Sequence, residues 1–231
     1  YRVHEGPTPE RLAGLREFLG SFGLQVGGGD KPHALDYAEV LAKCKGRPEA
    51  QLLQTVMLRS LRQAVYSPNN LGHFGLAYDG YTHFTSPIRR YPDLLVHRAI
   101  KAALNGKKYN PGSWTELGGH CSMTERRADE ATRDVDAWLK CYYMRDRVGE
   151  TFEGTVSSAV AFGIFVSLDG LYVEGLVHVS DLGSDYFHFD PAKHMLLGER
   201  TGRRYRIGDR VRVKVVRVDI ENSKIDFVLD D

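Results

Sequence analysis

The stretch TFEGTVSSAVAFGIFVSLDGLYVEGLVHVS, residues 151–180, decides the fold of the C-terminal part of this chain. It consists of short runs of β-branched and aromatic residues separated by Gly and Asp, which is typical of strands joined by tight turns. It supplies three strand candidates, and two more follow it: 151–156, 163–166, 175–179, 210–218 and 224–228. Five short strands in about 80 residues predict a small closed Greek-key barrel, the OB architecture.

Residues 1–148 show a helical pattern instead. Thr8-Pro9-Glu10 is typical of a helix N-terminus, and apolar residues follow it at helical spacing. Further helices are expected over 35–43, after Pro48, and from Pro92 to Asn105-Gly106. The predicted fold class is therefore α+β, with a mainly helical part, 1–148, followed by a five-stranded antiparallel OB-fold barrel, 149–231.

Two local patterns in the first part carry more specific predictions. Ser122-Met-Thr-Glu125 has the form of a capping box, so we expect a long helix to begin there. Residues 74–85 alternate loosely between apolar and polar positions, which predicts a hairpin that turns at Asp79-Gly80.

The composition is that of an ordinary soluble protein, with 42% hydrophobic and 26% charged residues among 231. This length suits two domains. No apolar run of about 18 residues is present, so we expect no membrane association. The start, YRVHEGPTPE, resembles no signal peptide and lacks an initiator Met, so we expect the chain to be part of a larger protein.

The cysteines indicate the cellular compartment, and the charge distribution indicates the kind of binding partner. Cys44, Cys121 and Cys141 are far apart and form no CxxC pair, which argues against a zinc cluster and suits a reducing cytoplasm. We interpret them as small buried apolar residues. The net charge is only +1, but the segment 200–217 is rich in arginine, with Asp209 as its one acid. A basic stripe of this kind contacts phosphate.

The predicted barrel carries candidates for nucleic-acid binding. Phe162 and Phe165 flank a strand start, and His178 lies on the next strand. Aromatic faces on such a barrel stack the bases of single-stranded nucleic acid, and Arg212 and Lys214 would then line its backbone. Periodicity alone leaves open that both rings form the barrel core. The long connection 184–206, with aromatic residues at 186, 187 and 189, either adds a contact surface or packs beneath the barrel.

The segment GHFGLAYDGYTHFTSPIRRYPDLLVHR, residues 72–98, holds three His, five aromatic residues and three Arg. Arg89 is the candidate catalytic residue, because a guanidinium binds two phosphate oxygens at once and favours a transition state that gathers charge on them. Ser86 lies in the same turn and is a candidate RNA contact. Arg90 either contacts a second phosphate or forms an ion pair. Tyr91 either stacks on a base or packs under the loop.

The three histidines of this segment have no metal-ligand spacing, and we expect structural hydrogen bonds for each of them: His73, His83 and His97.

Longer motifs carry a resemblance to known families. The stretches GTVSSAVAFGIFVSL, GLVHVSDL and GDRVRVKVVRVD resemble the S1 RNA-binding domain over residues 149–231. The segment 73–98 is similar to the late signature of the RNB (ribonuclease II/R) exoribonucleases, as are YRVHEGP and SMTERRADEATRDVDAW. The resemblance implies processive hydrolysis of single-stranded RNA from its 3′ end to 5′ nucleoside monophosphates with Mg²⁺. It places Arg89 at the scissile phosphate, and Phe162, Phe165 and His178 on the RNA-facing surface.

One departure from the family pattern concerns the metal. The family holds magnesium with a tight aspartate cluster of the form D-x-x-x-x-x-D-x-D-D, which this sequence lacks. Metal-assisted hydrolysis needs such carboxylates. We therefore expect no metal site in this chain and the Mg²⁺ ligands upstream of it.

Two hypotheses follow: the chain is part of an exoribonuclease, or by itself it is an RNA-binding module without catalysis. A third is a non-catalytic relative that regulates RNA. We expect single-stranded RNA as the partner, the ribosome or RNA-decay factors as further candidates, and a monomer.

Overall fold

The computed structural model describes residues 1–230, and its contacts divide the chain into two compact units. The first comprises residues 1–43 and 56–130, and the second comprises 44–55 and the chain from 131 onward. The described residues form five α-helices: α1 (Pro9–Gly20), α2 (Ala34–Cys44), α3 (Ala50–Ser60), α4 (Tyr91–Leu104) and α5 (Trp114–Met144). None of them is long and apolar enough to cross a membrane.

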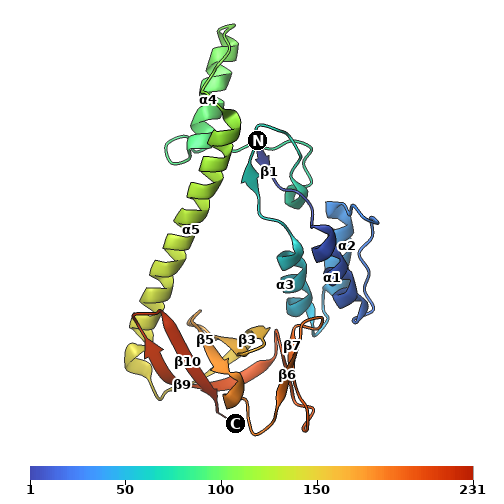
Figure 1. Cartoon of the computed structure of the whole chain (residues 1–231), viewed down its shortest axis with the longest axis vertical. Coiled ribbons are helices and arrows are strands. Elements are labelled where there is room, and N and C mark those ends of the chain that lie inside the picture. The colour runs from blue at the N-terminus through green and yellow to red at the C-terminus, as the bar shows by residue number, and fades with distance from the viewer. Residues whose placement is uncertain (231) are drawn as a thin grey trace. The chain divides into compact units, whose positions relative to one another are not determined.

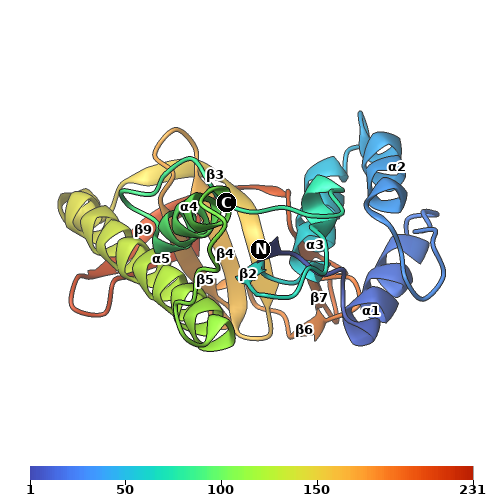
Figure 2. The same cartoon turned by 90° about the horizontal axis from the view of Figure 1, so that it is seen from above.

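The first unit confirms several helix predictions. Pro9 opens α1, and the side chain of Thr8 accepts a hydrogen bond from the Arg11 N–H, as the N-cap prediction required. Helices α1 and α2 lie side by side in both views (Figure 1 and Figure 2). Strands β1 (Arg2–Val3) and β2 (Val65–Tyr66) form a short antiparallel pair. This pair places residues 2–3 beside residues 65–66.

The capping-box prediction at Ser122 is wrong. Helix α5 begins at Trp114, so Ser122 lies well inside it. Its buried hydroxyl donates to the Gly118 carbonyl and accepts from the Tyr66 N–H, each at 2.8 Å. A serine that bonds back to the carbonyl four residues earlier is compatible with a helix interior, and here it also ties the helix to β2.

The hairpin predicted over 74–85 is also wrong. A short 3-10 helix, η1 (Phe74–Leu76), ends at Ala77 in the left-handed region, φ 55°. The His73 N–H donates to the Tyr78 carbonyl at 2.8 Å, which closes a tight loop instead of two strands. The residues that follow make isolated backbone contacts instead of a ladder: Tyr78 bridges His73, and the Tyr81 carbonyl accepts the Arg2 N–H at 2.8 Å.

The second unit contains the predicted barrel. Its five strands are β3 (Thr151–Val160), β4 (Gly163–Leu168), β5 (Glu174–His178), β9 (Arg210–Asp219) and β10 (Lys224–Leu229). They close in the order β10-β5-β4-β3-β9. All five strand candidates are confirmed. The core inside the ring includes Ile164, Val166, Val213 and Phe227.

The expectation of a fully antiparallel barrel needs correction, because β5 and β10 pair in parallel. The other four pairings are antiparallel. A closed ring with an odd number of strands cannot alternate direction all the way round. At least one parallel pair is therefore required, and it falls where β10 closes the ring on β5.

The connection between β5 and β9 forms a three-stranded sheet of β6 (Phe187–Asp190), β7 (Met195–Gly198) and β8 (Arg204–Arg206). Phe187, Leu196 and Tyr205 from these strands join the barrel core, whereas Tyr186 and His188 are exposed. One side of this sheet therefore packs on the barrel and the other faces outward. All three cysteines are buried and free, which confirms their interpretation as small core residues.

Candidate active site and nucleic-acid interface

The turn that carries Arg89 is held by one buried carboxylate. Asp93, in the first turn of α4, has no exposed surface and accepts from the Ser86 N–H and from Arg90 Nη2, each at 2.8 Å. The Ser86 carbonyl in turn accepts the N–H of Arg90 at 3.0 Å. Burial by itself raises the pKa of Asp93, but these hydrogen bonds outweigh it and hold the pKa below its ordinary value. The turn is thus fixed from its interior.

The two neighbouring arginines have opposite environments. Arg90 forms an ion pair with Asp93, so of its two interpretations the ion pair is confirmed. Arg89 is exposed, and its side chain makes no hydrogen bond or ion pair with any residue between 1 and 230. Tyr91 is 45% exposed, so part of its ring is open to solvent. The fixed turn therefore presents one unpaired guanidinium outward, a geometry suited to binding an anionic oxygen pair.

A polar network lies beside this turn. The Tyr66 hydroxyl contacts His83 Nδ1 at 2.9 Å and Glu125 at 3.3 Å, and Arg2 pairs with Glu125 at 2.6 Å. Burial and the Glu125 carboxylate raise the pKa of Tyr66 to about 12. Burial and the charges of Arg90 and Arg2 lower the pKa of His83. The network therefore favours a neutral phenol and a neutral imidazole.

The histidine prediction holds for two of the three residues. His83 has the contact above, and His97 contacts the Phe84 carbonyl at 2.8 Å while its ring stacks on Phe84. His73 differs, because its Nδ1 is buried without a hydrogen-bond partner among the described residues and its ring packs edge-on against His4 and Tyr81. Burial lowers the pKa of His73, which keeps this ring neutral.

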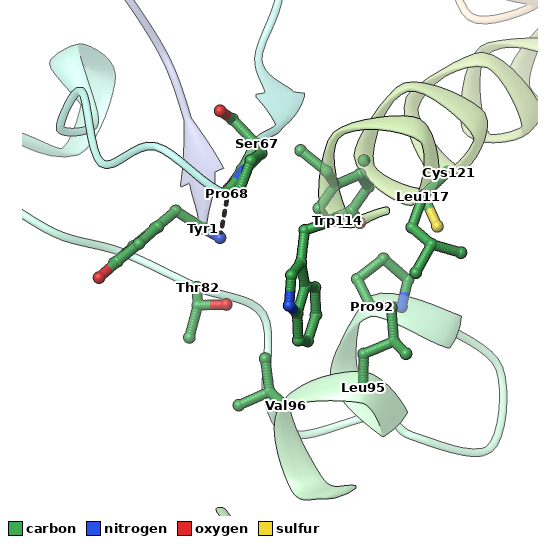
Figure 3. Close-up of a pocket in the computed structure, with 12 residues that line it drawn as sticks. Tyr1, Ser67, Pro68, Thr82, Pro92, Leu95, Val96, Trp114, Leu117 and Cys121 are labelled. Atoms are coloured by element: carbon green, nitrogen blue, oxygen red, sulfur yellow. Dashed lines mark hydrogen bonds between the residues drawn. The ribbon is translucent and has the colours of Figure 1, made fainter. Parts of the chain in front are cut away.

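A cavity of about 270 Å³ lies between β2, α4 and the start of α5 (Figure 3). Pro92, Leu95, Trp114 and Leu117 give it mainly apolar walls, and the Tyr1 backbone nitrogen donates to the Ser67 carbonyl at 2.8 Å. Catalytic pockets bring a few polar groups together at one point. The polar side chains among the lining residues of this cavity include those of Tyr66, Ser67 and Thr82.

On the barrel, the aromatic candidates lie on the outer surface. Phe162 is half exposed, and neither Phe162 nor Phe165 belongs to the core, so the alternative that they form it is wrong. Their rings meet edge-on with centroids 6.1 Å apart. His178 is exposed on β5, opposite Gly163 of β4, and its Nδ1 contacts the Ser180 hydroxyl at 2.8 Å. The structure therefore brings Phe162, Phe165 and His178 to one face.

The basic stripe lies elsewhere on the barrel and is largely neutralised. Arg212 and Lys214 are exposed on β9, which β3 separates from β4. Acids distant in sequence pair with several of the arginines: Asp169 with Arg210, Asp230 with Arg212, and Glu49 with Arg206. Lys214 has no such partner among the described residues. The stripe is consequently less basic in the fold than in the sequence.

Within residues 1–230, no group of three or more His, Cys, Asp and Glu side chains is arranged to hold a metal ion. Among the acids of α5, Asp136 pairs with Lys140 at 2.7 Å. The donor set of the described residues therefore does not fit a magnesium site. Sequence reasoning missed Asp93, although an acid in the first turn of a predicted helix beside the arginine turn was a usable signal.

Known protein families match both the first part of the chain and the barrel. The RNB domain matches residues 1–106, and the S1 RNA binding domain matches residues 145–229. Ribonuclease R of Escherichia coli K12 is 51% identical over 99% of this chain, and ribonuclease R of Vibrio cholerae is equally similar. The chain therefore contains an RNB match and an S1 match, and it is similar to ribonuclease R along its whole length. It spans 30% of the length of these two relatives.

The structural comparison shows the same similarity. The apo form of Mycoplasma genitalium RNase R superposes on all of this chain with a TM-score of 0.89 at 30% identity, and the chain covers 37% of it. The same enzyme in complex with ribose-methylated single-stranded RNA gives a TM-score of 0.88. This chain thus shares its fold with the matching part of Mycoplasma genitalium RNase R.

Proposed function

We propose that this chain is part of a hydrolytic exoribonuclease of the ribonuclease R type, which degrades single-stranded RNA processively from its 3′ end to 5′ nucleoside monophosphates. The observation that carries the proposal is Arg89, an unpaired guanidinium on a turn fixed by the buried Asp93. A cation held in place costs no reorganisation when charge develops on a phosphate, so it stabilises the transition state more than the ground state. Ser86 and Tyr91 are the further RNA contacts that we assign to this turn.

The barrel binds the RNA in this proposal. Phe162 and Phe165 stack bases, and His178 lies on the same face as a polar contact. Lys214 contacts the backbone, and Arg212 does so when it exchanges Asp230 for phosphate. Arg90 contacts RNA only through the part of its guanidinium that Asp93 leaves open.

Magnesium belongs to the whole enzyme in this proposal. Because the residues described here do not fit a metal site, its ligands lie in other parts of the protein. We place the enzyme in the cytoplasm as a monomer, with the ribosome and RNA-decay factors as candidate partners. We also place the boundary between the RNB part, 1–148, and the S1 domain, 149–231, close to Gly149, where the backbone has φ 93° just before β3.

A second candidate function concerns the chain on its own: an RNA-binding module without catalysis. The donor set described above favours it, because no metal-binding group is present among residues 1–230. Incubating the purified chain with 5′-labelled single-stranded RNA and Mg²⁺ separates the two. Binding without shortening supports the module, with catalysis confined to the whole enzyme. A ladder of 3′-shortened products shows that this chain holds the metal ligands and overturns their placement outside it.

A further inference from the structure

A groove of about 500 Å³ lies in the second unit, between the C-terminal half of α5 and the outer face of the barrel. Asp136, Ala137 and Lys140 line it from the helix, and Phe162, Phe165 and Asp226 are among the residues that line it from the barrel. Its volume lies within the range of pockets that take small ligands. The aromatic face described above is therefore one wall of a concave site, and α5 supplies the other.

The charges of this groove are of two kinds. Lys140 and Asp136 pair with each other across one turn of α5, and Glu174 accepts from the Ser157 hydroxyl at 2.5 Å. Lys224 and Asp226 differ, since their side chains form no hydrogen bond or ion pair with any described residue. The groove therefore contains one cation and one carboxylate whose bonding capacity is unused.

The register of the strands places these two groups with respect to the aromatic ring. Lys224 and Asp226 alternate with the buried Ile225 and Phe227, so both point to the outer face of β10, roughly 7 Å apart along the strand. Phe165 of β4 lies opposite Leu176 of β5, which lies opposite Asp226. A base that stacks on Phe165 covers Leu176 and brings its edge toward the carboxylate.

An unpaired carboxylate in a groove for a polyanion weakens binding unless it gains a donor from the ligand. The exocyclic amine of cytosine supplies such a donor, and acidic side chains accept from it in nucleic-acid complexes. Uracil presents a carbonyl oxygen at the same position, which the carboxylate repels. The unpaired Lys224 supplies the matching contact for the phosphate of the same nucleotide.

We propose that this groove holds one nucleotide of single-stranded RNA and that Asp226 makes it prefer cytosine over uracil. This inference rests on the proposed RNA binding by the barrel and assigns a specificity residue to it. The preference is local to one nucleotide, so it changes the affinity for a homopolymer without restricting the RNAs that the chain binds.

The test is fluorescence anisotropy with the whole 231-residue chain and two labelled RNAs, oligocytidine and oligouridine of equal length. We expect the unmodified chain to bind oligocytidine about tenfold more tightly than oligouridine. Asp226→Asn should bring the two affinities together, since an amide also donates to the uracil carbonyl. As the matched control, Lys224→Gln should weaken both RNAs alike and lower the salt slope of binding by about 0.7.

The outcomes separate this inference from the function on which it rests. If Phe162→Ala with Phe165→Ala weakens binding but the cytosine-to-uracil ratio stays the same in Asp226→Asn, the specificity role is refuted and RNA binding by the barrel stands. If neither RNA binds the unmodified chain, the specificity role of Asp226 and RNA binding by the barrel are both refuted. Ala137→Leu narrows the groove from the helix side, so unchanged binding by this variant would overturn the groove as the place where the nucleotide lies.

Discussion

Replacing Arg89 and Arg90 by alanine, one at a time, should give two opposite phenotypes. The two side chains are adjacent in sequence, but only Arg90 is tied to the buried Asp93. Arg90→Ala should destabilise the fold, because it leaves a carboxylate with no exposed surface without its cation. Arg89→Ala should leave stability unchanged, because the exposed Arg89 side chain has no partner to lose.

The loss of stability expected for Arg90→Ala follows from the contacts of Arg90. Breaking a buried ion pair by removing one partner costs about 3–5 kcal/mol. Arg90 is 24% exposed, and both its Nε and Asp93 Oδ1 are buried without hydrogen bonds among the described residues, so the pair is imperfect. We therefore expect the lower end, about 3 kcal/mol, or a melting temperature lower by roughly 6–12 °C. Arg89→Ala should stay within about 0.5 kcal/mol of the unmodified chain.

Thermal denaturation of this chain measures both effects, and single-turnover RNA hydrolysis by the whole enzyme measures the catalytic one. Arg89→Ala should slow hydrolysis by about 10²–10³-fold, the size found for losing one preorganised donor to a transition-state oxygen. RNA affinity should remain largely unchanged. Arg89→Lys is the control, because it keeps the charge but cannot bind two oxygens at once, so its loss should be smaller. An unchanged rate in Arg89→Ala, or a destabilisation equal to that of Arg90→Ala, would refute the reasoning.

Three further predictions follow from contacts elsewhere. Ser122→Ala leaves the Tyr66 N–H without its 2.8 Å acceptor and should cost about 1–3 kcal/mol in urea denaturation, whereas a value near zero would mean that the hydroxyl is replaceable. Because the pKa of Tyr66 is raised to about 12, its contribution to stability is complete below pH 10 and is lost as pH rises through 12. Tyr66→Phe should remove this alkaline loss of stability, and parallel pH profiles of the two chains would contradict it. Phe162→Ala with Phe165→Ala should weaken binding of single-stranded RNA by about 1–3 kcal/mol per stacked base in an anisotropy titration, and unchanged affinity would show that the rings face away from RNA.

The barrel could be predicted from sequence because its pattern is local. Each strand buries alternate residues, such as Ile164 and Val166 on β4, so period-two alternation and turn residues locate it without knowledge of its neighbours. The parallel pairing of β5 with β10 is not local, since it depends on the closure of the ring. The same distinction explains α5: Ser122 fits a capping motif in sequence, but its actual acceptor and donor partners include β2, more than 50 residues away.

The candidate site also combines a residue that the sequence predicts with surroundings that it does not. Arg89 could be singled out from residue type and motif alone. Its environment could not, because Asp93 becomes a buried anchor only when α4 turns its first residues beneath the loop. Its place in the first turn of a predicted helix marks Asp93 as an acid near a helix N-terminus, but no sequence pattern shows that it loses all its exposed surface.

The basic segment 200–217 shows why a run of charge is weaker evidence than a single unpaired side chain. In sequence it contains one acid, yet in the fold Arg206, Arg210 and Arg212 each lie beside a carboxylate that is distant along the chain or outside the segment. An arginine already paired must release its acid before it binds phosphate, which subtracts about 0–1 kcal/mol from the gain for an exposed pair. Lys224, which the run does not include, faces a groove beside Phe162 and Phe165 with no acid bound to it. Binding energy for a phosphate should therefore come more from such isolated cations next to aromatic rings than from the most basic stretch of the chain.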